Sequence, residues 1–280
     1  MRNPHIKARR RALALALWMP LALYGTGAAA QEGLRVTGTG SGTGGMQLLM
    51  EAFLRANPGV QGEVLPALGS SGGIRALIDG KIELAVSNRA PNAKDAALAP
   101  TQSFVYARTA VEMTVHKDVG VTSLTSDELA GLYADGGASF PTGRRARPVL
   151  RFSDALDMGI VKSFSPAVAA AIDAASSRHG LLDGATDSDT ADLIERTPGA
   201  FEPSTLALIE SEKRSLRVLA NGQWKHQKPL IMVMPEKPGA LAQRFVAYVK
   251  SAEGRRMSAP TEFLTHPADP ILTRGWTPTA

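Results

Sequence analysis

The sequence predicts an α/β protein with two lobes. Short runs of Val, Ile and Leu alternate with stretches of helical periodicity. Two glycine-rich segments, residues 38–45 and 69–73, each follow a strand-like run and lead into a helix-like one. The 280 residues, even without a short N-terminal leader, are too many for one small core and suit two lobes of about 100 to 150 residues each.

Residues 1–30 have the pattern of a secretory signal peptide. Three arginines at positions 9–11 precede an apolar run at 12–23, and three alanines at 28–30 form a small-residue cleavage site. The apolar run is shorter than the roughly 20 residues that span a bilayer. We therefore expect a soluble mature protein in the periplasm.

Composition narrows the possible partners. Removal of residues 1–30 takes away basic residues and no acidic one, which leaves the 26 acidic residues balanced by as many basic ones. A neutral chain favours neither nucleic acid nor an anionic membrane as its partner. The sequence has no cysteine, which excludes disulfides, thiolate metal sites and a cysteine nucleophile.

The first glycine-rich segment reads Gly-Thr-Gly-Ser-Gly-Thr-Gly-Gly and precedes a helix predicted from Met46. Free N–H groups and the positive dipole at a helix N-terminus favour an oxyanion, and the hydroxyls of Ser41 and Thr43 can add donors. A tight βα turn without a ligand is the alternative interpretation. The spacing Gly-x-Gly-x-x-Gly at 40–45, with Glu63 farther along, also keeps a dinucleotide-binding oxidoreductase open. Such cofactors are uncommon outside the cytoplasm.

The second glycine-rich segment, Gly-Ser-Ser-Gly-Gly, follows a strand predicted at 60–65 and opens another helix. A third predicted strand at 84–86 ends in Ser87, Asn88 and Arg89. The carboxyl ends of parallel strands meet at one edge of a sheet, where α/β proteins bind ligands. We therefore expect Ser70, Ser71 and Asn88 to lie near the first segment.

The run Gly-Ser-Ser-Gly-Gly-Ile at 69–74, followed by Ala-Val-Ser-Asn at 85–88, resembles the periplasmic phosphate-binding proteins of ABC transporters. The glycine-rich segment before the first helix is similar too, as are residues 124–133 and the Thr-Pro-Gly-Ala turn at 197–200. The resemblance implies a periplasmic-binding-protein-like fold, in which hinge strands join two lobes and a ligand cleft lies between them. We expect lobe 1 to comprise residues 33–112 and 232–265, lobe 2 residues 113–231, and a C-terminal extension residues 266–280.

The later elements follow in order. Strands are expected at 111–115, crossing into lobe 2, and at 149–151, 216–219 and 229–234; helices are expected from Ser126, at 159–164 and 168–175, from Thr186 and at 238–249. Arg144, Arg145 and Arg147 are interpreted as a solvated loop. Asp187, Asp189 and Asp192 are interpreted as helix-start residues that complement the dipole rather than as metal ligands, because the spacing of a calcium loop is missing.

The resemblance implies an exported, non-enzymatic solute-binding protein that captures a small oxyanion, phosphate or phosphate-like, for an ABC importer. Scattered histidines and the lack of a nucleophile elbow agree with a protein that is not an enzyme. We expect a monomer with a permease complex as partner, and with no cofactor, metal, catalytic residue or bound nucleic acid. The expected ligand-binding residues are Ser41, Thr43, Ser70, Ser71, Asn88 and Arg151. The alternative function is a sensor or accessory binding protein for another anion.

The sequence departs from the family pattern at the expected site. Asn88 stands where the family has Asp, and residues 155–158, among them Asp157, replace a turn that carries hydroxyls after the family's Arg, here Arg151. Asn does not repel a fully deprotonated oxyanion, whereas Asp157 repels a dianion. Glu202 and Pro203 also replace a Gly-Tyr pair. We therefore expect phosphate to bind weakly or not at all, and another oxyanion, a small carboxylate or a phosphoester stays open.

Overall fold

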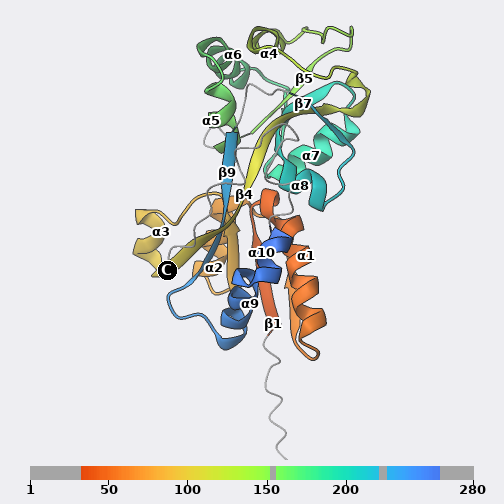
Figure 1. Ribbon diagram of the computed structural model, residues 1–280. Coiled ribbons are helices and arrows are strands. Elements are labelled where there is room, and N and C mark those ends of the chain that lie inside the picture. Colours follow the sequence, from red (N-terminus) through yellow and green to blue (C-terminus); the bar gives the residue numbers. More distant parts are fainter. Residues whose placement is uncertain (1–32, 152–155, 221–225, 259–280) are drawn as a thin grey trace, which may run out of the picture. The chain divides into compact units, whose positions relative to one another are not determined.

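The computed structural model describes residues 33–151, 156–220 and 226–258 (Figure 1). The predicted signal peptide at 1–30 and the predicted extension at 266–280 lie outside these described residues. None of the helices in the described ranges is both long enough and apolar enough to cross a membrane.

In this part of the chain, nine strands form one mixed sheet in the order β2-β1-β3-β9-β4-β7-β5-β6, with β8 paired to β4. β1 pairs in parallel with β2 and β3, and β5 pairs in parallel with β6 and β7, whereas β4 and β9 are antiparallel to their neighbours. The strands are β1 (Gly33–Gly38), β2 (Gln61–Val64), β3 (Leu84–Ser87), β4 (Thr101–His116), β5 (Arg147–Leu150), β6 (Leu182–Asp183), β7 (Ala200–Thr205), β8 (Leu216–Val218) and β9 (His226–Pro235).

We call the part built on β1–β3 the first lobe. Its helices are α1 (Gly40–Ala56), α2 (Gly69–Ile78), α3 (Ala93–Leu98), α9 (Ala240–Lys250) and α10 (Ala252–Ser258). The largest core of this lobe is mainly aliphatic, with Leu34, Leu49 and Val86 at its centre. Phe53 of α1 meets Phe245 of α9 edge to face, with ring centroids 5.1 Å apart, so α9 packs back on the first lobe as its apolar stripe predicts.

The second lobe is built on β5–β8. Its helices are the 3-10 turn η1 (Lys117–Val119), α4 (Ser126–Ala134), α5 (Leu156–Lys162), α6 (Pro166–Ser176), α7 (Asp187–Arg196) and α8 (Leu206–Ser211). α4 and α7 begin where the sequence predicts, and Thr125 and Thr186 cap them with capping boxes, so the N-cap of α4 is Thr125 and not Ser126. Tyr133 and Phe140 both pack on Phe201 in the core of this lobe.

Two long strands connect the lobes (Figure 1). β4 and β9 pair with each other from Thr101 opposite Pro235 to Val111 opposite His226, with a register shift after Val105. β9 also pairs with β3 of the first lobe, and β4 also pairs with β7 of the second. The predicted α/β fold with two lobes and hinge strands is thereby confirmed. The predicted lobe boundaries stay a prediction, because these strands continue through both parts.

The glycine-rich segment after β1 differs from the prediction. α1 begins at Gly40 rather than at Met46, so most of the expected loop is the first turns of the helix. Close packing explains why glycines stand there. A Cβ at Gly42 would lie 2.5 Å from Val86 Cγ1, and one at Gly40 would lie 2.8 Å from the backbone nitrogen of Ser188. The segment therefore lets α1 approach β3 and α7 closely.

Candidate functional site

The N-terminus of α1 binds a carboxylate that belongs to the chain itself. Asp187, the first residue of α7, places Oδ2 2.8 Å from Thr39 Oγ1, which donates a hydrogen bond to it. The backbone N–H of Ser41 donates to the same oxygen at 3.1 Å, and Ser41 Oγ lies 3.2 Å from it. A helix N-terminus stabilises negative charge through these free N–H groups and its dipole. The Asp187 carboxylate therefore occupies an oxyanion position.

Asn88 competes with Asp187 for the hydroxyl protons of Thr39 and Ser41. Its Nδ2 donates to the carbonyl oxygen of Pro229 at 2.8 Å, and this bond turns Oδ1 toward Thr39 and Ser41. Asn88 Oδ1 lies 2.7 Å from Thr39 Oγ1 and 2.8 Å from Ser41 Oγ. Each hydroxyl has one proton, so Asn88 Oδ1 and Asp187 Oδ2 share the two protons. The amide is thus an acceptor that competes with the bound anion for these donors.

Two cations meet Asp187 from its other side. Arg151 Nη1 donates to Asp187 Oδ1 at 2.6 Å and to Asp157 Oδ2 at 2.9 Å. Lys228 Nζ donates to both oxygens of Asp157, at 2.6 and 2.7 Å, and lies 3.2 Å from Asp187 Oδ1. The Lys228 side chain is 2% exposed and that of Arg151 12%. Charges this deeply buried need such partners, because water does not solvate them.

A third carboxyl group lies beside Arg151. Glu202 of β7 is fully buried, and no hydrogen bond from a described residue reaches either of its oxygens or Arg151 Nε. Glu202 Oε1 and Arg151 Nε are 4.0 Å apart. We call the side chains around Asp187, namely Thr39, Ser41, Asn88, Arg151, Asp157, Glu202 and Lys228, the Asp187 pocket.

The pKa values of the three acids of the pocket shift in different directions. Burial opposes ionisation of Asp187, but Lys228 and Arg151 outweigh it and hold its pKa well below the usual range. Burial raises the pKa of Glu202 well above its ordinary value, against the opposing effect of Arg151. Burial therefore favours the protonated, uncharged form of Glu202. Burial also raises the pKa of Asp157, and Lys228 offsets part of that rise.

The structure brings together some of the residues predicted for the site. Ser41, Asn88 and Arg151 all contact Asp187 or its donors. Thr43 Oγ1 instead bonds the Gly40 carbonyl at 3.2 Å, and Ser70 Oγ accepts from the Asn88 N–H at 2.9 Å. Ser71 Oγ accepts from Arg89 on the exposed side. Whether these side chains contact a solute stays a prediction.

Asp187, Glu202 and Lys228 were not among the expected site residues. Asp187 is an acidic residue of the first turn of α7, as predicted, and its carboxylate also accepts a hydrogen bond from the N-terminus of α1, which the sequence did not predict. Thr186 and Asp189 do form the capping box of α7, and Asp192 pairs with Arg214. Among the described residues, no group of three or more His, Asp or Glu side chains could hold a metal ion.

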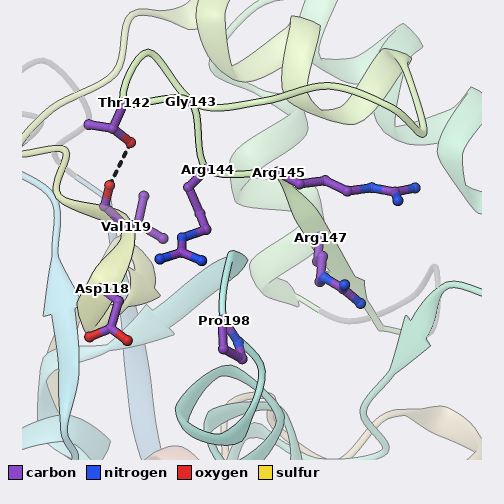
Figure 2. A pocket seen from close by; sticks show the side chains of 8 residues that line it. All are labelled: Asp118, Val119, Thr142, Gly143, Arg144, Arg145, Arg147 and Pro198. Carbon is purple, nitrogen blue, oxygen red and sulfur yellow. Dashed lines mark hydrogen bonds between the residues drawn. The ribbon is translucent and has the colours of Figure 1, made fainter.

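The basic run of the second lobe lines a separate hollow of about 400 Å³. Figure 2 shows the side chains of Arg144 and Arg145 pointing in different directions, with Asp118 and Pro198 on the far side of the hollow from Arg145. All three arginines are exposed, as predicted, but Arg147 is the first residue of β5 rather than part of a loop. A larger groove of about 680 Å³ lies beside the pocket and is lined by Thr43, Thr186 and Ser188, among others.

Comparison with known proteins places the chain in a family. Residues 25–253 match the model of a PBP superfamily domain. The chain belongs to the PBP superfamily. No curated protein matches the sequence significantly. The superfamily match and the fold agree with the predicted resemblance to periplasmic phosphate-binding proteins, and the likeness extends to the fold.

Solved structures with this fold come from transporters and from regulators. A candidate phosphate ABC transporter substrate-binding protein from Clostridium perfringens, solved with phosphate, is 17% identical, with a TM-score of 0.63 over 82% of this chain and 98% of that one. The CcmR regulatory domain of Synechocystis PCC6803, in complex with 2-PG, is 12% identical, with a TM-score of 0.52 over 78% and 96%. The regulatory domain of MexT from Pseudomonas aeruginosa is 14% identical, with a TM-score of 0.52 over 81% and 100%. At these identities the likeness establishes the fold.

Proposed function

We propose that this PBP superfamily protein is an exported, non-enzymatic solute-binding protein that captures a small oxyanion between its lobes for an ABC importer. One observation carries the proposal. The Asp187 carboxylate accepts hydrogen bonds from Thr39 and Ser41 at the N-terminus of α1 and contacts Arg151 from the second lobe. It stands in for the anionic group of a solute, and its partners are the groups that would bind one.

The hydrogen-bond donors around Asp187 are numerous enough for a solute to bind with micromolar affinity. Micromolar affinity corresponds to about 8 kcal/mol, and hydrogen bonds to charged groups contribute roughly 1.5 to 3 kcal/mol each before entropy losses. Thr39 Oγ1, Ser41 N–H, Ser41 Oγ, Arg151 Nη1 and Lys228 Nζ all reach Asp187. Four or five such bonds to a solute reach micromolar affinity.

The donors come from both lobes, so a bound solute would favour the closed arrangement. Thr39 and Ser41 belong to the first lobe, Arg151 follows β5 of the second, and Lys228 lies on the hinge strand β9. A ligand shifts such an equilibrium only by its differential affinity for the two states. A membrane permease would then read the closed form in which the solute has taken the place of Asp187.

Transport is favoured over sensing by the N-terminal sequence rather than by the fold. The fold occurs both in a candidate transporter component and in the regulatory domains of CcmR and MexT. The arginines, apolar run and alanines of residues 1–30 have the pattern of an export signal, which suits a periplasmic receptor. A sensor for an anion is the second candidate function.

The test is a thermal-shift screen of the mature chain with phosphate, sulfate, molybdate, a phosphonate and small organic acids, followed by calorimetry on the hits. Ser41→Ala removes a donor of the Asp187 pocket and is expected to weaken the hits at least tenfold. Ser163→Ala is the matched control, because Ser163 Oγ donates to the Ile160 carbonyl on the exposed side of the second lobe, outside the pocket. If no anion binds the parent, or if both variants bind like the parent, the proposed function is wrong.

A further inference from the structure

We propose that the solute is a small monocarboxylate, whose carboxylate group takes the position that the Asp187 carboxylate occupies in this structure. This inference rests on the proposed function and names the chemical class of its anion. Asp187 is then the built-in competitor of the solute.

The donors of the pocket match a group with two oxygen atoms. Thr39 Oγ1 and the Ser41 N–H donate to Oδ2 of Asp187, at 2.8 and 3.1 Å. Arg151 Nη1 and Lys228 Nζ reach the other oxygen, Oδ1, at 2.6 and 3.2 Å. The first lobe thus holds one oxygen and the cations hold the second. A carboxylate has these two oxygens and no others.

The remaining groups around this position are acceptors or acids. Asn88 presents its oxygen, because its amide nitrogen already bonds Pro229. Asp157 and Glu202 present carboxyl groups, and Asp157 is 1% exposed. The third and fourth oxygens of phosphate or sulfate would face the Asn88 oxygen and the Asp157 carboxylate, where an unprotonated oxygen is repelled. A carboxylate avoids this conflict.

Charge balance also favours a single negative charge. Among the described residues of the pocket, the cations Arg151 and Lys228 contact the carboxylates of Asp157 and Asp187, and burial disfavours a further negative charge on Glu202. Departure of Asp187 leaves one positive charge without a partner. A monoanion restores the balance, whereas a dianion adds an unpaired buried charge, which is costly in a site this dry.

A second, independent observation indicates a missing polar group at this place. Glu202 is fully buried, and no described residue bonds either of its oxygens or Arg151 Nε. One oxygen atom beside the 4.0 Å gap between Glu202 Oε1 and Arg151 Nε can lie at hydrogen-bond distance from both. Buried polar groups are nearly always bonded in native proteins. A solute or the water that accompanies it completes this pair.

Release of Asp187 requires α7 to move away from α1. A Cβ at Gly40 would lie 3.0 Å from Asp187 Cβ, so the two backbones touch in this arrangement. The groove lined by Thr43, Thr186 and Ser188 lies next to this contact. A solute can enter from that side as the lobes separate, and it then bridges the donors that Asp187 bridges here.

The experiment is a chemical rescue of the full mature chain. Asp187→Ala removes the competitor and leaves its donors. Sodium acetate and sodium glycolate are expected to raise the melting temperature of this variant saturably, whereas sodium chloride at equal ionic strength does not. Calorimetry is expected to show both carboxylates binding the variant at least tenfold more tightly than the parent, because the parent must first displace an intramolecular carboxylate.

The matched control is Asp192→Ala, which removes a half-exposed carboxylate from the same helix on its Arg214 side. It is expected to respond to acetate like the parent. If Asp187→Ala does not fold, Asp187→Asn carries the test, because it keeps the shape and removes the charge. Its melting temperature is expected to rise more with acetate than that of the parent.

The outcomes separate this inference from the proposed function. If phosphate or sulfate binds the parent or the Asp187 variants more tightly than acetate and glycolate do, the monocarboxylate is wrong and an anion-binding function stands. If no anion binds the parent or any variant, both are wrong. If acetate acts equally on Asp187→Ala and Asp192→Ala, Asp187 is not the competitor and the inference fails.

Discussion

Gly40→Ala tests whether the contact between α1 and α7 holds the two lobes together. A Cβ at this position would lie 2.6 Å from Ser188 Oγ, 2.8 Å from Ser188 N and 3.0 Å from Asp187 Cβ, whereas ordinary contact begins at 3.4 Å. Packed backbones do not absorb such an overlap, so α7 must retreat by roughly 0.6 Å. The Ser41 N–H bond to Asp187, 3.1 Å long, then exceeds hydrogen-bonding distance.

The magnitude follows from the bonds that are lost. Asp187 accepts charge-assisted hydrogen bonds from Thr39 and Ser41, which contribute about 1.5 to 3 kcal/mol each. Water forms hydrogen bonds to the separated groups and recovers part of this free energy. We expect Gly40→Ala to lower the free energy of unfolding by about 2 to 4 kcal/mol.

Gly45→Ala is the control on the same helix. A Cβ at Gly45 meets nothing within 4 Å, and Ala is favoured over Gly in a helix interior by up to about 1 kcal/mol. The two variants should therefore differ by about 2 to 5 kcal/mol in urea unfolding, or by roughly 4 to 20 °C in melting temperature. Equal stability of the two variants would refute the close packing of α1 on α7.

Three further predictions concern the buried charges. Arg151→Ala should weaken anion binding more than Arg151→Lys does, because lysine keeps a cation where Nη1 contacts Asp157 and Asp187. If calorimetry shows that both variants bind like the parent, Arg151 has a structural role only. Lys228→Met should lower the free energy of unfolding by about 3 to 5 kcal/mol, measured in urea, because the buried Asp157 carboxylate loses its lysine partner. Adding Asp157→Asn should recover part of this loss. Strictly additive losses of the two variants would contradict the pairing. Burial raises the pKa of Glu112 from 4.5 to about 7, so the folded state holds an extra proton between these values and stability falls as pH rises through that window. Glu112→Gln removes this effect and should gain up to about 3 kcal/mol over the parent at pH 8 and nothing below pH 4, measured by urea unfolding across pH.

The fold was predictable because its signals are local. Each glycine-rich segment follows a strand and opens a helix, and Thr125 and Thr186 begin helices with capping boxes that can be read from the sequence. The start of α1 was not predictable in the same way. Glycine disfavours helix, and it is tolerated at Gly40 and Gly42 because α7 and β3 approach there. Contacts between distant segments decided that boundary.

The site was only partly predictable, and for a related reason. Ser41 and Asn88 lie at a helix N-terminus and a strand end, which are positions that a sequence pattern reveals. Lys228 lies just before the apolar run predicted as a strand at 229–234, and its burial depends on how β9 pairs with β4. Asp187 has the sequence context of an ordinary first-turn acid. Only the packing of α7 on α1 shows that its carboxylate serves a different helix.

The internal carboxylate sets a limit on how tightly any solute can bind. A solute that uses the donors of Thr39, Ser41 and Arg151 must first break their bonds to Asp187. Its apparent dissociation constant is therefore the intrinsic one divided by the fraction of molecules in which Asp187 is displaced. A preference of about 2.8 kcal/mol for the self-bound arrangement makes the apparent dissociation constant roughly a hundredfold weaker. The same preference closes the lobes without solute, which means that the closed arrangement alone cannot report that the site is loaded. Under the proposed function, the signal to a permease would then come from what differs between the two closed forms, and the position of Asp187 is the difference that this pocket offers.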